Sequence, residues 1–507
     1  MDKQQEFVEH IQEGYSFKGD HIFLGAAMLD GKPRAEAPVK IPLKTLNRHG
    51  LIAGATGTGK TKTLQILAEN LSEKGIPVLM MDIKGDLSGI ARAALPNEKL
   101  AARHELIGFP FVSRATPVEL MSLTEQPGVK LKATVSEFGP VLFSKILELS
   151  ETQTGILSII FKYCDDNHLP LLDLKDLKKI LLFSTEEGKE EFEKDYGRIS
   201  KASTGTILRK IVALEQQGAE VFFGEPSFDV QDLTRKTSDG AAYVNIIRLD
   251  DLQDKPGLFS TFMLSLLAEI YSTFPEKGDS EKPELVIFID EAHLIFKEAS
   301  GALMDQLESI IKLIRSKGIG VYFITQNPTD VPQEILSQLG LKIQHSLRAF
   351  TANDRKAIKL AAENYPLSDY YDTKTVLTSL GIGEALVSVL DEKGRPTPLA
   401  ATMLRAPQSR MDILTSEEIK EITGKSELVH KYNRSIDRES AHEILTQKIE
   451  RADKEDAREK AKEEREKVSR TSRTSGSSSK RQGAVIKVLT SATFIRGVMS
   501  ILNKAFK

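Results

Sequence analysis

Residues 54–61 read Gly-Ala-Thr-Gly-Thr-Gly-Lys-Thr, and this short stretch restricts the fold more than any other part of the chain. It fits the pattern G-x-x-x-x-G-K-[ST] of a phosphate-binding loop, the Walker A pattern. A short apolar run at residues 51–53 precedes it, and apolar residues at helical spacing follow it. A strand, a glycine-rich loop and a helix are therefore predicted in the order that such a loop requires. All other segments can be placed relative to it.

The residue types in this loop suit the binding of a phosphate group. Glycine reaches positive φ and lets the backbone approach an anion, and N–H groups at a helix N-terminus favour negative charge. We expect Lys60 to reach the β- and γ-phosphates and the Thr61 hydroxyl to bind Mg²⁺. A glycine-rich loop that matches by chance is the weaker alternative. The pattern predicts a site for ATP and Mg²⁺ with these nucleotide-binding residues: Gly54, Ala55, Thr56, Gly57, Thr58, Gly59, Lys60, Thr61 and Lys62.

A second apolar run, at residues 285–289, ends in Asp290 and Glu291. We expect Asp290 to hold Mg²⁺ through water and Glu291 to act as general base on the attacking water. Gln326 follows the apolar run at residues 321–325, where its amide could sense the γ-phosphate or orient water. Simple strand termination is the alternative for the acid pair. The set predicts hydrolysis, because a P-loop kinase has no use for a hydrolytic base.

Three further side chains near these strand ends have two open interpretations. Asp82 and Asp86 follow the apolar run at residues 77–81, and a functional role and simple turn chemistry are equally supported for them. His293 completes Asp-Glu-Ala-His, and a packing or capping role is at least as well supported as a catalytic one.

Composition limits the class of protein. The chain has 507 residues and a net charge of −3, so any nucleic-acid site must be a local basic surface. The single cysteine, Cys164, excludes an internal disulfide framework and fits a reducing compartment. The N-terminus is polar and acidic, and no run of about 18 apolar residues precedes the C-terminal tail. We therefore expect a cytoplasmic protein.

Strand patterns alternate with helical patterns along much of the chain, which predicts a mainly parallel α/β sheet with helices on both faces. Apolar stripes at helical spacing dominate residues 137–220, so an α-helical insertion is predicted there. The predicted organisation is a short N-terminal β segment at 1–46, a core at 47–136 and 221–410, the insertion at 137–220, a charged helical region at 411–470, a flexible basic linker at 471–483 and an amphipathic helix at 484–507.

The predicted C-terminal helix carries an apolar seam with residues three and four apart. The seam comprises Val485, Val488, Ala492, Ile495, Met499, Leu502 and Phe506. A tethered helix of this kind docks on its own core, on a protein partner or on a membrane surface, and docking to protein is the favoured interpretation.

Several of these stretches together resemble the HerA–FtsK superfamily of DNA-pumping ATPases, and more specifically the YjgR-like bacterial branch. The resemblance extends from about residue 17 to residue 410. It is carried by residues 54–61, 285–293, 314–320 and 324–328, and also by residues 133–137, 151–153, 224–226 and 382–386.

The resemblance implies a RecA-like P-loop NTPase core, assembled as a homo-oligomer in the form of a hexameric ring with ATP between subunits. In such rings an arginine of the neighbouring subunit completes the site. Arg315, Arg348 and Arg355 are the candidates, with surface ion pairing as the alternative for each. The segment before the phosphate loop is too short for the N-terminal β-barrel of archaeal HerA proteins.

Two kinds of output are expected from ATP hydrolysis by such a chain. The first, implied by the resemblance, is movement or unwinding of DNA by a translocase or helicase-like motor. The alternative is a nucleotide-gated assembly or membrane-surface ATPase that acts on a protein partner through residues 484–507. A phosphotransferase is a third option, and it would require an acceptor for turnover.

Overall fold

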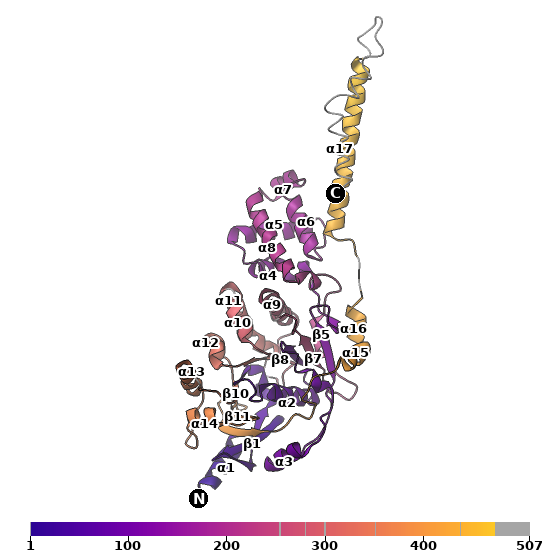
Figure 1. Cartoon of the computed structure of the whole chain (residues 1–507). Helices are drawn as coiled ribbons and strands as arrows, with labels where there is room; N and C mark the ends of the chain where they lie inside the picture. Colours follow the sequence, from indigo (N-terminus) through magenta and orange to yellow (C-terminus); the bar gives the residue numbers. More distant parts are fainter. Residues whose placement is uncertain are drawn as a thin grey trace. The chain divides into compact units, whose positions relative to one another are not determined.

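The computed structural model describes residues 2–252, 255–278, 280–298, 301–349, 351–434, 436 and 438–471 (Figure 1). The chain divides into two compact units, residues 1–444 and residues 445–507. The sheet, the phosphate loop and the acid pair all lie in the first unit.

Twelve strands of the described residues form one sheet in the order β2-β1-β12-β11-β10-β3-β9-β8-β4-β7-β5-β6. The strands are β1 (His21–Leu29), β2 (Lys32–Pro42), β3 (Gly50–Ala53), β4 (Val78–Asp82), β5 (Val118–Ser122), β6 (Val129–Lys130), β7 (Val244–Arg248), β8 (Leu285–Ile289), β9 (Ile319–Thr325), β10 (Leu341–Gln344), β11 (Glu384–Ser388) and β12 (Ala400–Leu404). All neighbours from β10 to β6 are parallel. Every residue of β3, β4, β8 and β9 is buried, as expected when helices cover both faces. The prediction of a mainly parallel α/β sheet is confirmed.

The remaining pairs, from β2 to β10, are antiparallel. Strand β11 runs antiparallel to β10, which is compatible with the prediction of a mainly parallel sheet. Helices α13 (Ala352–Glu363) and α14 (Thr373–Ser379) lie between the two strands in the chain and pack on each other. The helix pair returns the chain to the sheet edge that it left, so β11 begins where β10 ends.

The N-terminal segment contains a helix that the sequence analysis did not predict. Helix α1 (Lys3–Gly14) begins after Asp2, whose carboxylate accepts the N–H of Gln4 as an N-cap. Its Phe7 and Ile11 are completely buried in the main core. The helix thereby covers the β1–β2 hairpin, which it contacts mainly through β2.

The other helices are α2 (Lys60–Glu73), α3 (Glu98–Leu106), α4 (Val135–Ile146), α5 (Glu151–Asp166), α6 (Leu174–Phe183), α7 (Lys189–Asp195), α8 (Lys201–Gln216), α9 (Pro256–Thr273), α10 (His293–Glu298), α11 (Gly301–Ile314), α12 (Gln333–Leu336), α15 (Ser416–Gly424), α16 (Glu427–Tyr432) and α17 (Ala441–Thr471). Helices α4 to α8 follow one another between β6 and β7, and α5, α6 and α8 pack together (Figure 1). Thr134, Ser150 and Asp173 each complete a capping box at a helix start in this group. The helical insertion of the predicted fold class is present.

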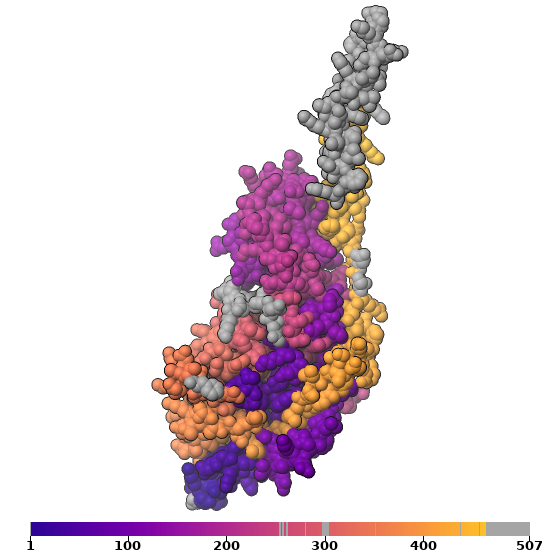
Figure 2. Space-filling view, in the orientation of Figure 1, coloured from indigo at the N-terminus to yellow at the C-terminus, as the bar shows by residue number. Residues whose placement is uncertain are grey.

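Helices α15 and α16 pack along the sheet edge, against β5 and β6. In Figure 2 this orange segment lies on the indigo and purple surface formed by the first part of the chain. Arg92 and Arg410 both bind Glu418 of α15, at 3.3 and 2.6 Å. These ion pairs fix the start of the charged region on the core.

None of the helices in the described ranges is long and apolar enough to span a membrane. The predicted linker from residue 472 and the predicted amphipathic helix at 484–507 lie outside the described residues. A protein partner or membrane surface for that helix stays a prediction.

Candidate active site

The phosphate loop joins β3 to α2, as the pattern predicts. Gly54, Gly57 and Gly59 have φ values of 153°, 80° and 113°, which favour glycine. Gly59 is the N-cap of α2, and no side chain caps the helix there. The N–H groups at this helix start are therefore left for an anion. A Cβ at Gly57 would meet nothing within 4 Å, so the tip of the loop is open.

The Lys60 side chain lies within the loop that carries it. Its Nζ donates to the backbone oxygens of Gly54 at 2.6 Å and Ala55 at 3.2 Å, and the residue is 7% exposed. Burial and the nearby Lys84 ammonium lower the pKa of Lys60, while Glu291, Asp290 and Asp86 oppose that shift. Lys60 is thus the buried cation among a group of carboxylates.

The acid pair lies two strands away from the phosphate loop, at the same edge of the sheet. Strand β9 separates β3 from β8, and all three are parallel, so Gln326 at the end of β9 lies between loop and acid pair. Asp290 and Glu291 are each 5% exposed. Burial and the adjacent Glu291 raise the pKa of Asp290 to about 6. The two motifs, 230 residues apart, meet in one site.

Glu291 has an unusual backbone conformation, with φ of 46°. Such a conformation costs a non-glycine residue about 1–3 kcal/mol and is common at functional sites. The Lys84 ammonium forms an ion pair with Oε1 and Nδ1 of His293 lies 3.1 Å from Oε2, but neither contact has hydrogen-bond geometry. His293 therefore contacts the predicted general base, whereas Lys84 was not among the predicted site residues.

Lys84 belongs to residues 82–87, which we term the β4 turn. The Asp82 carboxylate accepts hydrogen bonds from the N–H groups of Gly85, Asp86 and Leu87 at 2.8, 3.2 and 3.1 Å. Of its two predicted roles, Asp82 thus has the structural one, which is to stabilise the turn. Burial raises the pKa of Asp82 to about 7, and the charges of Asp86 and Asp290 add to the shift.

Asp86 has a different role from Asp82. Its Oδ2 accepts the Thr61 hydroxyl at 3.2 Å, and its Oδ1 is buried with no hydrogen-bond partner among the described residues. Asp86 therefore brings a carboxylate to the predicted magnesium ligand Thr61.

Residues just after β10 and just before β11 also contact the phosphate loop and the start of α2. His345 is fully buried, and its Nε2 lies 2.9 Å from the Thr63 hydroxyl. Burial and the Lys60 charge lower the pKa of His345 to about 4, so this imidazole is neutral. The N–H of Gly383 donates to the Thr58 oxygen at 3.0 Å. Both residues lie over 280 positions from the loop, and although Gly383 belongs to the stretch 382–386 that carries the resemblance, no sequence pattern assigns either residue to the site.

Gly54→Ala is expected to destabilise the protein and distort the loop. A Cβ there would lie 2.5 Å from Cβ of His345, and φ of 153° strains any other residue. We expect a loss of about 1–3 kcal/mol, measured as a lower Tm and as weaker ATP binding. Gly155→Ala in α5 is the matched control, because its Cβ would meet nothing within 4 Å and alanine favours a helix. Equal Tm values for the two variants would contradict the predicted packing.

The three predicted arginines differ in their distance from the loop. Nη2 of Arg348 lies 3.4 Å from the Thr56 oxygen, so Arg348 borders the phosphate loop of its own chain. Arg355 is exposed on α13. Arg315 is exposed just before β9 and lies at the opposite edge of the sheet from the loop, because β9 and β3 are parallel. Of the three, Arg348 is the one with a contact to this loop among the described residues.

The residues of this site fit a nucleotide and Mg²⁺. An open glycine cradle faces uncapped N–H groups, and a buried ammonium lies beside it. Thr61 and Asp290 supply oxygen donors, the type that Mg²⁺ takes, and the buried Oδ1 of Asp86 is a further one without a partner. The Lys62 side chain points elsewhere, since its Nζ donates to the Met411 oxygen at 2.5 Å.

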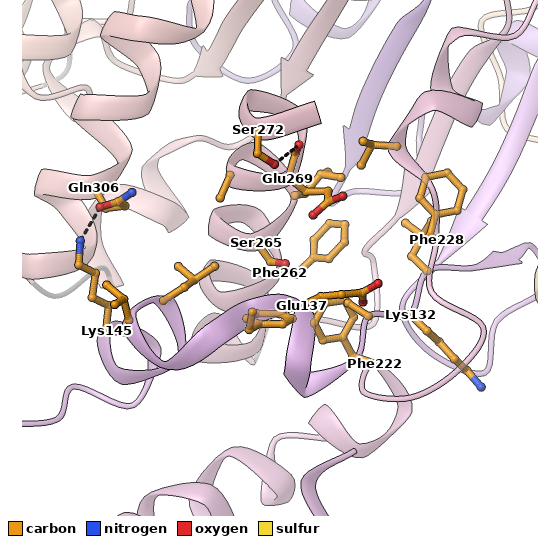
Figure 3. A pocket seen from close by; sticks show the side chains of 18 residues that line it. Lys132, Glu137, Lys145, Phe222, Phe228, Phe262, Ser265, Glu269, Ser272 and Gln306 are labelled. Carbon is orange, nitrogen blue, oxygen red and sulfur yellow. Dashed lines mark hydrogen bonds between the residues drawn. The ribbon is translucent and has the colours of Figure 1, made fainter. Parts of the chain in front are cut away.

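A separate cavity of about 340 Å³ lies between α4, α9 and α11. Figure 3 shows the rings of Phe222, Phe228 and Phe262 and the carboxylates of Glu137 and Glu269 around it. Burial, together with the Glu137 charge, raises the pKa of Glu269. No residue of the phosphate loop or acid pair lines this cavity, so it is distinct from the predicted nucleotide site.

The sheet order, the loop after β3 and the insertion define a RecA-like P-loop NTPase fold. The bacterial conjugative coupling protein TrwB has this fold: its structure aligns with a TM-score of 0.50 and 14% identity, over 81% of this chain and 94% of TrwB. A TrwB complex with the ATP analogue ADPNP gives the same TM-score. Residues 28–505 match the family described as Helicase HerA-like C-terminal, and the chain belongs to this family.

Two curated relatives are named as helicases. The DNA double-strand break repair helicase HerA of Sulfolobus acidocaldarius is 23% identical over 352 residues, which cover 69% of this chain and 64% of the relative. Probable helicase MJ1565 of Methanocaldococcus jannaschii is 26% identical over 379 residues, which cover 73% and 65%. The chain thus spans less than two thirds of the length of these relatives.

Proposed function

We propose that the chain is an ATP hydrolase that uses ATP and Mg²⁺ to drive a DNA translocase or helicase-like motor. The observation that carries the proposal is the meeting of Lys60 and Thr61 with Asp290 and Glu291 at one sheet edge. A phosphate cradle next to a carboxylate base is the arrangement that hydrolysis of a triphosphate requires.

Each side chain has a defined task in this proposal. The loop N–H groups and Lys60 bind the phosphates, and Thr61 and Asp290 hold Mg²⁺, which neutralises charge on the phosphate oxygens when bound. Glu291 accepts a proton from the attacking water, and Gln326 orients that water. Arg348 borders the loop in the same chain and is placed to stabilise developing charge.

DNA as the substrate is supported by the relatives. The Sulfolobus acidocaldarius protein is named as a DNA double-strand break repair helicase, and the Methanocaldococcus jannaschii protein as a probable helicase. Because this chain has a net charge of −3, a DNA surface must be local rather than global.

DNA is expected to stimulate phosphate release by the purified protein. The measurement compares ATPase rates with single-stranded DNA, double-stranded DNA and no nucleic acid, at low and moderate salt. Binding that depends on phosphate contacts weakens as salt rises, so the stimulation should fall with ionic strength. Heparin is the control for a non-specific polyanion effect. Equal rates with and without both forms of DNA would argue against a DNA motor.

We further propose assembly as a hexameric ring with nucleotide at the subunit contacts. Arg315 and Arg355 are both exposed, and Arg315 lies at the opposite edge of the sheet from the loop of its own chain, which suits a role at a neighbouring subunit's site. An arginine supplied in this way contributes about 10³–10⁵-fold to the rate in other nucleotide hydrolases. Mass measurement with and without bound ATP tests the assembly.

A further inference from the structure

The β4 turn connects the two halves of the proposed active site. At one end Asp86 accepts the hydroxyl of Thr61 from the phosphate loop. At the other end Lys84 contacts the Glu291 carboxylate after β8. The neighbouring strands β4 and β8 are parallel, so the turn and the acid pair emerge at the same sheet edge. The Asp82 carboxylate accepts three N–H groups of the turn and so stabilises its backbone conformation.

Lys84 itself is held among opposite charges. Burial alone would lower its pKa, but contact with Glu291 and the charges of Asp290 and Asp86 raise the pKa overall. The side chain is 36% exposed, against 6% for that of Glu291. The lysine therefore reaches inward from the site mouth to a buried carboxylate, and its charge acts on Lys60 as well.

A general base must keep one orientation toward the water that it activates, and an error of about 1 Å in such a site can cost about 10²-fold in rate. The Glu291 carboxylate would rotate freely about its last torsion without partners. The Lys84 ammonium and Nδ1 of His293 lie against its two oxygens from two different segments, and Glu291 itself has an unusual backbone φ of 46°.

We propose that Lys84 is a positioning residue for hydrolysis, which the β4 turn presents so that its ammonium orients the Glu291 carboxylate. This inference rests on the proposed ATPase function, since it assigns a partner to the proposed base. Through Asp86 and Thr61 the same turn ties the orientation of the base to the phosphate loop.

The test compares Lys84→Met, Lys84→Arg and Glu291→Gln with the parent protein. Lys84→Met should lower kcat about 10- to 100-fold, with the Kd for ATP and the Tm close to those of the parent. Lys84→Arg keeps a cation that can reach the carboxylate and should recover a large part of kcat. Lys74→Met is the matched control, because Lys74 pairs with Asp20 on the surface, away from the site. Its kcat should equal that of the parent.

A double variant separates a positioning role from a merely structural one. In the Glu291→Gln background, single-turnover rates with and without Lys84→Met should agree, because Lys84 acts through the carboxylate that is already absent. Parent-like kcat in Lys84→Met, or an equal loss of rate in both backgrounds, would overturn the inference. If the parent itself releases no phosphate from bound ATP, the proposed function fails. If the parent and Glu291→Gln behave as expected but Lys84→Met equals the parent, the role of Lys84 fails alone.

Discussion

Glu291→Gln is expected to lower kcat by about 10²–10⁴-fold while ATP still binds, because an amide cannot accept the proton of the attacking water. The substitution keeps the size of a buried side chain that is 5% exposed, so the fold should be retained. The glutamine can still meet Lys84 and His293 through its carbonyl oxygen or its amide. The expected loss is therefore in chemistry and not in assembly of the site.

Single-turnover phosphate release and equilibrium ATP binding measure the two effects separately. Glu363→Gln is the matched control, since Glu363 is exposed at the end of α13. A kcat for Glu291→Gln within a few-fold of the parent would assign the base to another residue. Loss of ATP binding with retained Tm would instead assign Glu291 to nucleotide contact.

Lys60→Ala is expected to remove most ATP binding and to bring hydrolysis below detection. A hydrogen bond to a charged group contributes about 1.5–3 kcal/mol, which corresponds to roughly 10- to 150-fold in Kd. The variant also loses two hydrogen bonds that close the loop, from Nζ to the oxygens of Gly54 and Ala55. Both effects act on the same loop, so affinity and rate should fall together.

Titration of ATP binding by calorimetry and a phosphate-release assay check this expectation. Lys60→Arg keeps the charge, but its planar guanidinium does not match the compact ammonium among the loop oxygens, so it should recover little activity. Lys74→Ala removes an exposed lysine and should leave both quantities unchanged. Turnover by Lys60→Ala at the parent rate would disprove the proposed site.

The parts of the site that the sequence predicts are those with local patterns. The phosphate loop needs a fixed spacing of glycines, lysine and threonine, and the acid pair ends an apolar strand. Each motif can therefore be recognised from a stretch of about ten residues. The contacts of Lys84 and His345 depend instead on which strands become neighbours. The sequence places β4 over 200 residues before β8, and no local rule says that they pair. Lys84 therefore has no predicted role, although it stands between Asp82 and Asp86 at the end of the same strand.

The fold shows the same division between local and long-range information. The mainly parallel sheet follows from the alternation of apolar strands and amphipathic helices, and this prediction is confirmed. The antiparallel direction of β11 against β10 does not follow from it, because it depends on the helix pair α13–α14 returning the chain to one edge. Helix α1 was missed because its apolar face is narrow, with Phe7 and Ile11 as its buried residues.

The pairing of β1 with β12 has a consequence for any shortened version of the protein. Residues 25–27 match residues 402–404 in register, and β2 is the outermost strand on that side. A fragment that began at the phosphate loop would lack β1 and β2, and one edge of β12 would then expose a row of unpaired backbone N–H and C=O groups. Such an edge is a template for self-association, so the fragment would aggregate even with its nucleotide pocket intact. The first 46 residues thus cover this sheet edge and keep the protein soluble, although they contribute no residue to the proposed active site.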